Sequence, residues 1–304
     1  MDPTLTDTVF IHTTHRQMVG ALVSEYSMRR NSRHPDRFDV KIIDVRDFPW
    51  AQAKEGQLYL RDGLKREWLM EDLQSFTPIR FTPPELMGYE GRAVVVDPDV
   101  FAVGDVNELL TRDMQGKAVM CRPRGVSGKK YATSVMLLEC AKLTHWKCKE
   151  QFEAMFRFEL DYMDWINLEN EPEENVGLFE PEWNDFDKLT PQTKMLHNTS
   201  RWTQPWKSGL PIDFTPSTKN HSIFKVVSWY RRAREAMFGR YGALGTYKKH
   251  PDPNQERFFF TLLKECVEKG VISEQLIRDE MAKNHVRHDA FEVMDRLAPV
   301  KAAA

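Results

Sequence analysis

One short segment constrains this chain more than any other, the run RAVVVDPDVF at residues 92–101. Its three consecutive valines suit a strand that is buried on both faces, as in the middle of a parallel sheet. The strand ends in Asp97 and Asp99, one residue apart. In an open α/β sheet, ligands bind at the carboxyl ends of the strands. Because two carboxylates placed there repel each other, the pattern predicts a divalent metal ion that carries a phosphate ligand.

Two other interpretations compete for this motif. Asp and Pro are common turn residues, so the segment also fits a plain Asp-Pro turn that closes the strand. A calcium loop of the EF-hand type would place Asp97, Asp99 and Glu108 at its first, third and twelfth positions. That loop requires glycine at the sixth position, where this chain has Ala102, and its fifth position is Phe101. We therefore exclude the calcium loop and keep the plain turn as an alternative.

Composition narrows the class of protein. The 304 residues, 41% of them hydrophobic and 29% charged, describe an ordinary globular chain that can bury a substantial core. A formal net charge of -2 gives no reason to expect a nucleic-acid partner. The chain has no apolar run long enough to cross a bilayer, and its first residues lack a basic-then-apolar signal, so we expect a cytoplasmic protein.

Strand and helix patterns alternate along the first two thirds of the chain. The residue patterns predict strands over residues 8–13, 38–45, 94–96, 131–139 and 194–197. They predict helices over residues 14–30, 56–75 and 152–167. Such alternation is typical of an α/β fold with a doubly wound sheet.

The pattern changes after Pro216 and becomes helical. Amphipathic spacing predicts helices over residues 223–238, 258–267, 273–281 and 290–297. We therefore expect two domains, an α/β domain over residues 1–217 and a helical C-terminal extension over residues 218–304. The stretch 219–249 is strongly basic and contains several aromatic residues. It either contacts an anionic membrane as a peripheral segment, holds an acidic acceptor, or packs as a helix with a solvated basic face.

Three motifs, in order along residues 10–206, resemble the retaining, glycogenin-like glycosyltransferases of family eight, which share the GT-A fold. GALV at residues 20–23 is similar to the helix that follows the nucleoside-binding loop in that family. VVVDPDVFAVGDVNEL at residues 94–109 is similar to its metal-binding DxD strand and the segment after it. Residues 197–206 resemble its late histidine motif, which ends in Pro-Trp, and residues 132–138 are a weaker match to another strand. The resemblance implies a mixed, doubly wound GT-A sheet with a helical extension.

The resemblance also implies a metal site and a reaction. Asp97, Asp99 and His197 would bind Mn²⁺ or Mg²⁺, and Mn²⁺ accepts carboxylates mixed with imidazole more readily. The ion would stabilise the negative charge that forms on a nucleoside diphosphate leaving group. The expected enzyme moves a hexose from a nucleoside diphosphate sugar, in this family a UDP-sugar, to a glycan, lipid or protein acceptor with retention of configuration. A histidine by itself would equally suit a structural role in a core.

Further residues would face the sugar nucleotide. The resemblance assigns nucleotide-sugar contacts to Thr13, Thr14, Arg80, Asp97, Thr133, Ser134, Arg201 and Gln204. Gln204 stands where the family has a lysine that contacts the diphosphate, so Arg201 or Lys207 would have to supply the missing cation. Arg80 lies where the family carries a basic nucleotide contact, but it also suits a solvated surface position.

The expected catalytic carboxylates depart from the family pattern. The helix start that reads Asp-Gln-Asp in the family corresponds to residues 162–167, where Tyr162 replaces the first acid. Asp161, one residue earlier, and Asp164, which matches the second acid, are the candidate catalytic residues. These departures leave open an alternative function, a GT-A-fold protein that has lost catalysis and serves as a binding or scaffold module. Nucleotidyl transfer ranks last because no glycine-rich activating loop lies near the amino terminus.

Overall fold

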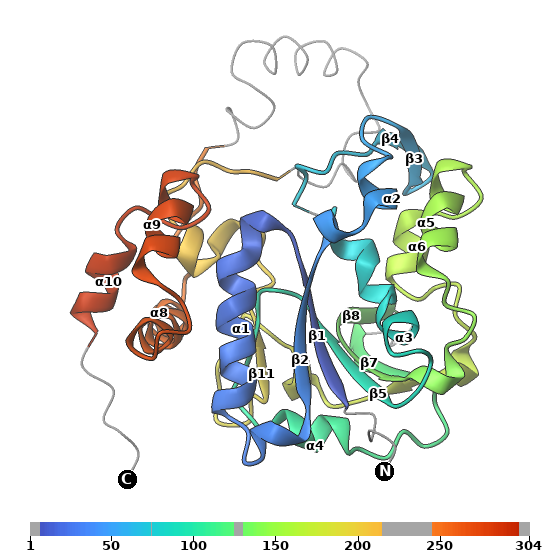
Figure 1. Cartoon of the computed structure of the whole chain (residues 1–304), viewed down its shortest axis with the longest axis horizontal. Helices are drawn as coiled ribbons and strands as arrows, with labels where there is room; N and C mark the ends of the chain where they lie inside the picture. Colours follow the sequence, from blue (N-terminus) through green and yellow to red (C-terminus); the bar gives the residue numbers. More distant parts are fainter. Residues whose placement is uncertain (1–6, 74, 125–129, 215–244, 298–304) are drawn as a thin grey trace. The chain divides into compact units, whose positions relative to one another are not determined.

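The computed structural model describes residues 7–73, 75–124, 130–214 and 245–297 (Figure 1). The chain divides into two compact units. The first contains Met1–Met70 and Ser75–Thr199, and the second contains Glu71–Gln74 and Ser200–Ala304. The boundary expected near residue 217 lies outside the described residues, as do the expected helix over residues 223–238 and most of the basic stretch 219–249.

The first unit is built on a six-stranded mixed sheet. Its order is β2 (Asp39–Asp44), β1 (Thr8–Thr13), β5 (Arg92–Val96), β8 (Lys130–Glu139), β7 (Val119–Arg124) and β9 (Val176–Leu178). Strand β1 runs parallel to both of its neighbours, whereas β8 is antiparallel to β5 and to β7. The expected mixed α/β sheet is therefore confirmed, and the strands expected over residues 8–13, 38–45, 94–96 and 131–139 are present.

Helices cover both faces of this sheet. The helices of the first unit are α1 (Met18–Arg30), α2 (Pro49–Gln52), α3 (Pro83–Leu86), α4 (Val106–Leu110), α5 (Cys148–Phe156) and α6 (Tyr162–Ile166). In Figure 1, α1 lies on one side of β1 and β2, and α3, α5 and α6 lie on the other. The middle strand β5 is covered on both sides, because Ala93 through Val96 are completely buried. This burial accounts for the unbroken apolar run in the sequence.

A second, three-stranded sheet extends the first unit beyond the end of β5. Its order is β10 (Asp185–Phe186), β11 (Met195–His197) and β6 (Val100–Ala102). Strand β6 is held by α1, because Ser24 Oγ donates to the carbonyl of Val100 at 2.6 Å and Ser27 Oγ accepts from the amide of Ala102 at 2.8 Å. Helix α1 thereby fixes the strand that follows the two aspartates.

The helix expected over residues 56–75 is wrong. These residues contain a hairpin of β3 (Leu58–Arg61) and β4 (Leu64–Glu67). Asp62 and Gly63 have positive φ angles of 53° and 70°, which is the backbone of a two-residue hairpin turn. Tyr59 packs edge-on against Trp68 at 5.4 Å between ring centroids. The turn and this packing outweigh the helical spacing of the leucines, since local periodicity does not determine which partner a segment meets.

The helix expected over residues 152–167 is two helices. Helix α5 ends at Phe156, and Phe158 then adopts a positive φ of 62°, which no α-helix accommodates. Asp161 starts α6 as its N-cap. No strand was predicted at β7, because its proline and two arginines interrupt the apolar pattern of a strand.

The second unit contains the helical C-terminal region. Its helices are α8 (Pro253–Glu268), α9 (Glu274–Ala282) and α10 (Ala290–Arg296), in agreement with the last three expected helices. Arg287, which is 5% exposed, pairs with Glu256 of α8 and with Asp289 just before α10. Its amide also donates to the carbonyl of Trp206 at 2.7 Å. No helix in the described ranges is both long enough and apolar enough to cross a membrane.

Candidate metal centre

The two aspartates leave the central sheet in a tight turn. The amide of Asp97 donates to the carbonyl of Ser134 on β8 at 2.9 Å, which continues the sheet for one more residue. The amide of Val100 then donates to the carbonyl of Asp97 at 3.1 Å and closes the turn. Both carboxylates therefore start from the carboxyl end of β5, where an α/β sheet binds its ligands.

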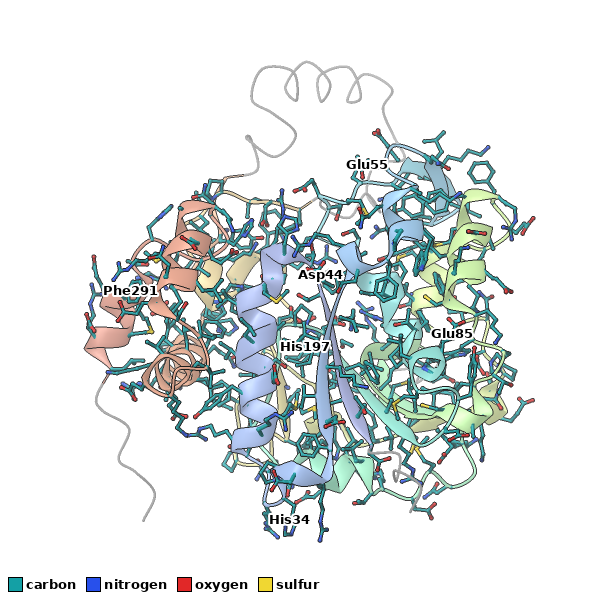
Figure 2. The ribbon with its side chains drawn as sticks, in the orientation of Figure 1. His34, Asp44, Glu55, Glu85, His197 and Phe291 are labelled. Atoms are coloured by element: carbon teal, nitrogen blue, oxygen red, sulfur yellow. The ribbon has the colours of Figure 1, made fainter. Side chains whose placement is uncertain are left out.

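His197 reaches this turn through the small second sheet. Strand β11 is antiparallel to β6 with His197 opposite Val100, and the amide of Asn198 donates to the carbonyl of Asp99 at 3.0 Å. Single ligand atoms of Asp97, Asp99 and His197 all lie within 4.8 Å of one another. His197, labelled in Figure 2, is 5% exposed, and its Nε2 lies 3.3 Å from Oδ1 of Asp99.

Two side chains lie against the same oxygen of Asp97. Arg80 donates from Nη2 to Oδ1 of Asp97 at 2.7 Å, and Nε2 of His12 lies 2.9 Å from that atom. Arg80 is only 5% exposed, so the surface interpretation of this arginine is wrong. His12, completely buried, was missed by sequence reasoning. Its one signal in the sequence is a polar residue near the end of an apolar strand.

These contacts determine the charges at the site. Burial alone would raise the pKa of the Asp97 carboxyl, but the charge of Arg80 and the contact with His12 outweigh it and lower the pKa to about 2. Burial likewise works to lower the pKa of His197, but the neighbouring Asp99 carboxylate outweighs it and raises the pKa. The pKa of His12 is lowered, chiefly by its burial. Asp97 is therefore an anion at neutral pH.

Thr133 and Ser134 belong to the same network. Arg80 donates from Nη1 to the hydroxyl of Thr133, and that hydroxyl donates to the carbonyl of Ile166 at 2.6 Å. Ser134 contacts the side chain of Asn184, which in turn contacts His197. One network of contacts thus joins six expected site residues, namely Arg80, Asp97, Asp99, Thr133, Ser134 and His197.

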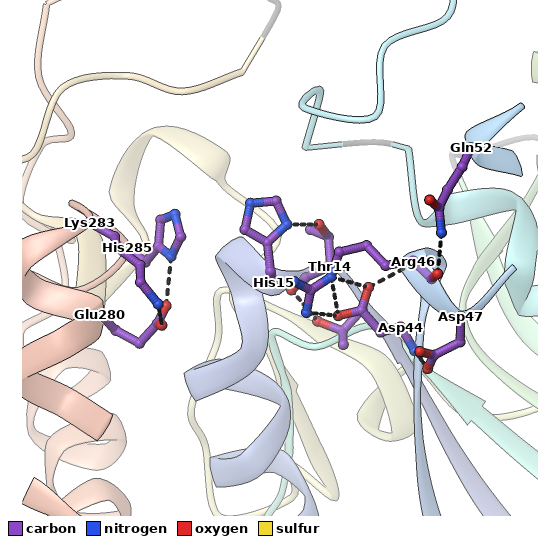
Figure 3. Close-up of polar contacts among 10 residues, drawn as sticks. Thr14, His15, Asp44, Arg46, Asp47, Gln52, Glu280, Lys283 and His285 are labelled. Atoms are coloured by element: carbon purple, nitrogen blue, oxygen red, sulfur yellow. Dashed lines mark hydrogen bonds and ion pairs between the residues drawn. The ribbon is translucent and has the colours of Figure 1, made fainter. Parts of the chain in front are cut away.

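The expected nucleoside loop follows β1. Thr13 pairs in register with Asp44 at the end of β2, and Thr13 Oγ1 donates to the carbonyl of Thr14 at 3.2 Å. Figure 3 shows Thr14, whose Oγ1 lies 3.2 Å from Nδ1 of His15, and the fork of Arg46 on the Asp44 carboxylate. Because β1 and β2 are parallel, these side chains lie at the carboxyl ends of their strands, as Asp97 does.

Asp161 has a structural task. Its carboxylate accepts from the amide of Met163 at 2.8 Å, and so caps α6. It also accepts from the amides of Gly63 at 2.8 Å and Asp62 at 3.1 Å, which hold the turn of the β3–β4 hairpin. Asp164, the other expected catalytic carboxylate, lies half-buried in the middle of α6.

The remaining expected contacts belong to the second unit. Lys207 is completely buried, and its Nζ pairs with Oδ2 of Asp213 at 2.5 Å. The Arg201 guanidinium lies 5.6 Å from the centre of the Phe214 ring. The carbonyl of Gln204 accepts from the amide of Lys207 at 3.0 Å, so Gln204 begins the short turn through Pro205.

The donor set of the first unit fits a divalent ion. Two ligands at right angles on an ion with bonds of about 2.1 Å lie about 3 Å apart, close to the 3.3 Å between His197 Nε2 and Asp99 Oδ1. The cluster has more acidic groups than guanidinium groups, because Asp97 and Asp99 contribute two carboxylates and Arg80 contributes one guanidinium. Carboxylates together with an imidazole suit Mn²⁺ and, less well, Mg²⁺. Asp97, Asp99 and His197 are therefore the residues that could hold a metal ion.

Comparisons with known proteins give a mixed result. No family model and no curated protein matches the sequence. Among solved structures, the galactosyltransferase LgtC with donor and acceptor sugar analogues is 13% identical, with a TM-score of 0.46 over 66% of this chain and 89% of that chain. The glycosyltransferase GlyE of Streptococcus pneumoniae TIGR4 is 15% identical, with a TM-score of 0.47 over 88% of this chain and 64% of its own length. Mouse xyloside xylosyltransferase 1 is 13% identical, with a TM-score of 0.41 over 64% of this chain and 98% of that chain. At identities of 13–15% and TM-scores below 0.5, these likenesses carry no conclusion about this chain.

Proposed function

We propose that this protein is a metal-dependent glycosyltransferase related to the glycogenin-like family. It would transfer a hexose from a nucleoside diphosphate sugar, namely a UDP-sugar, to an acceptor. The acceptor would be a glycan, a lipid or a protein. The observation that carries the proposal is the convergence of Asp97, Asp99 and His197, whose ligand atoms lie within 4.8 Å of one another beside the end of β5.

The roles of the residues follow from their contacts. Asp97, Asp99 and His197 would hold Mn²⁺ or Mg²⁺, which when bound would supply Lewis-acid stabilisation of the diphosphate leaving group. Arg80 holds Asp97 ionised, so that the carboxylate is ready for a cation without loss of a proton. The hydroxyls of Thr133 and Ser134 and the loop at Thr13 and Thr14 would contact the donor.

Retention of configuration is part of the proposal. In the family that this chain resembles, the acceptor is thought to attack from the face that the diphosphate leaves, and the diphosphate takes the acceptor proton. Such a reaction needs no carboxylate nucleophile. The commitment of Asp161 to three backbone amides is consistent with that mechanism.

Ligand binding tests the donor and the metal together. Nucleoside diphosphates and their sugars would be screened by thermal shift with and without Mn²⁺, since a ligand that binds the native state raises the apparent stability. We expect one nucleotide to raise the melting temperature in a metal-dependent manner. A screen in which no nucleotide responds to the ion contradicts the proposal.

Substitution of the aspartates tests the assignment directly. Asp97→Asn and Asp99→Asn should each abolish transfer from a radiolabelled donor sugar and weaken donor binding, because each removes a charged ligand. Glu108→Gln, on an exposed carboxylate of α4 that pairs with Lys194, is the matched control and should keep activity. Normal turnover by either aspartate variant refutes the metal assignment.

A second function is favoured by one observation. The family lysine that contacts the diphosphate is replaced by Gln204, so the chain could bind a sugar nucleotide without transferring the sugar. Metal-dependent hydrolysis of a labelled donor, or transfer to any acceptor, excludes such a binding or scaffold role.

Two expectations about location and organisation remain proposals. The basic stretch 219–249 would place the protein at the surface of an anionic membrane, and sedimentation with phosphatidylserine vesicles tests that contact. A boundary near residue 217 predicts preferential proteolytic cleavage there.

A further inference from the structure

Asn184 lies beside the candidate metal centre and is completely buried. It ends the short 3-10 helix Pro181–Asn184 and leads directly into β10. Its Oδ1 lies 2.9 Å from Nδ1 of His197, on the side of the imidazole away from Asp99. Nothing in the spacing of the sequence signals this contact.

The neighbours of Asn184 determine how its amide is turned. Its Nδ2 lies 3.5 Å from the carbonyl of Ala132, which can only accept a hydrogen bond. The same Nδ2 donates to Oγ of Ser134 at 2.9 Å, and that hydroxyl lies 3.3 Å from Oδ1. The nitrogen of the amide therefore faces β8, and its oxygen faces His197.

An amide oxygen has no hydrogen to donate, so this orientation selects the form of His197. Nδ1 must carry a hydrogen to make the 2.9 Å contact with Asn184. In a neutral imidazole, the lone pair is then on Nε2, the nitrogen that lies 3.3 Å from Asp99. That nitrogen is the one available to a metal ion.

The plane of the imidazole is held from the same strand. Phe186 is paired with His197 in the parallel register of β10 and β11, and its ring meets the imidazole edge-on at 5.5 Å and 75°. Arg122 lies 4.1 Å over the Phe186 ring and donates from Nη1 to the carbonyl of Asn184 at 2.5 Å. Asn184 thus determines which ring nitrogen carries the hydrogen, and Phe186 holds the tilt of the ring.

We propose that Asn184 is the positioning residue of the metal site, and that it keeps His197 in the Nδ1–H form so that Nε2 is presented to the ion. The inference rests on the proposed metal function of the cluster. Partners of this kind on a ligating histidine raise metal affinity, and their loss typically costs about 10- to 100-fold.

Titration of the full chain with Mn²⁺ alone, without a sugar nucleotide, tests the proposal. Asn184→Leu has nearly the shape of asparagine but offers no acceptor, and it should weaken Mn²⁺ binding by about 10- to 100-fold. Asn184→Asp keeps an acceptor at the same place and should bind Mn²⁺ close to the wild-type affinity. The matched control is Asn175→Leu, at a half-buried asparagine that contacts Glu171, and it should bind as wild type.

The form of His197 gives a readout that a merely structural role would not change. The metal-free protein labelled with ¹⁵N at histidine, at a pH where the imidazole is neutral, should show the His197 signals of an Nδ1–H imidazole, assigned by their loss in His197→Gln. In Asn184→Leu these signals should shift toward a mixture of the two tautomers, and in Asn184→Asp they should stay. Wild-type His197 that carries its hydrogen on Nε2 overturns the inference.

The outcomes separate this inference from the proposed function. Wild-type protein that does not bind Mn²⁺ overturns both. Wild-type protein that binds Mn²⁺, with a folded Asn184→Leu variant that binds equally well, overturns only the role of Asn184. If Asn184→Leu does not fold, Asn184→Asp decides, because loss of Mn²⁺ binding in that folded variant contradicts the proposal.

Discussion

Arg80 donates a 2.7 Å hydrogen bond to the carboxylate of Asp97, and the two side chains are 7% and 17% exposed. A buried charge that loses its partner costs far more than a surface charge does. Arg80→Met should therefore lower the free energy of unfolding by about 3 kcal/mol in metal-free buffer. Urea denaturation measures the change.

A double-mutant cycle isolates the pair. Asp97→Asn combined with Arg80→Met should be less destabilised than the sum of the two single variants, because the double variant leaves no unpaired charge. Arg112→Met, which breaks the exposed pair with Glu180, is the control and should cost less than about 1 kcal/mol. Strict additivity of the Arg80 and Asp97 effects would falsify the coupling.

Asp161 should matter for stability through its three amide contacts. Asp161→Ala removes the N-cap of α6 and the anchor of the hairpin turn, and we expect a loss of about 1 to 2 kcal/mol in the free energy of unfolding. Asp161→Asn should keep most of the stability, because asparagine caps helices as well as aspartate does. An alanine variant as stable as the wild type would show that these contacts contribute nothing.

Gly63 should resist replacement because of its backbone conformation. Its φ is +70°, and a Cβ at this position would meet no other atom within 4 Å, so strain rather than collision decides the effect. Gly63→Ala should lower the free energy of unfolding by about 1 kcal/mol. Gly63→Asn should cost less, since asparagine tolerates positive φ, and thermal unfolding of the two variants side by side measures the difference. Equal stability of the alanine variant and the wild type would contradict the turn.

Glu280 of α9 should make stability depend on acid pH. Burial works to raise the pKa of its carboxyl, but hydrogen bonds from His285 and Lys283 outweigh burial and lower the pKa below the ordinary 4.5 (Figure 3). A lowered pKa in the folded state means that the stabilisation is complete above pH 4.5 and is lost as the pH falls through the folded-state value. Glu280→Gln should therefore destabilise the protein at pH 7 and converge with the wild type at acid pH.

Urea denaturation across pH 3 to 7 checks the convergence. Glu274→Gln, on an exposed carboxylate of the same helix, is the control and should change the profile little. A Glu280→Gln variant that runs parallel to the wild type at every pH would exclude this carboxyl as a source of the acid sensitivity.

Much of the framework was readable in the sequence. The strands β1, β2, β5, β8 and β11 were predicted to within a few residues, because their apolar residues form short runs or alternate with polar ones. The three C-terminal helices were predicted from a different pattern, since each repeats its apolar residues every three or four positions. The aspartates after β5 were predicted to be site residues because two carboxylates at the end of a buried strand repel each other unless a cation lies between them.

Other features depended on contacts that no local pattern contains. Residues 56–75 have helical spacing, yet they form a hairpin because Asp62 and Gly63 turn the chain and Tyr59 meets Trp68. The meeting of His197 with Asp97 was expected from a family resemblance and not from spacing, since a hundred residues separate them.

The sequence by itself determined which segments are buried and where the charges stand along the chain. Only the tertiary structure decided that Arg80 is buried against Asp97, that Asp161 caps a helix, and that Asn184 faces His197. The reason is physical. Hydrophobic periodicity is a property of neighbouring residues, whereas the partner of a buried polar group comes from whichever strand or helix the fold brings beside it.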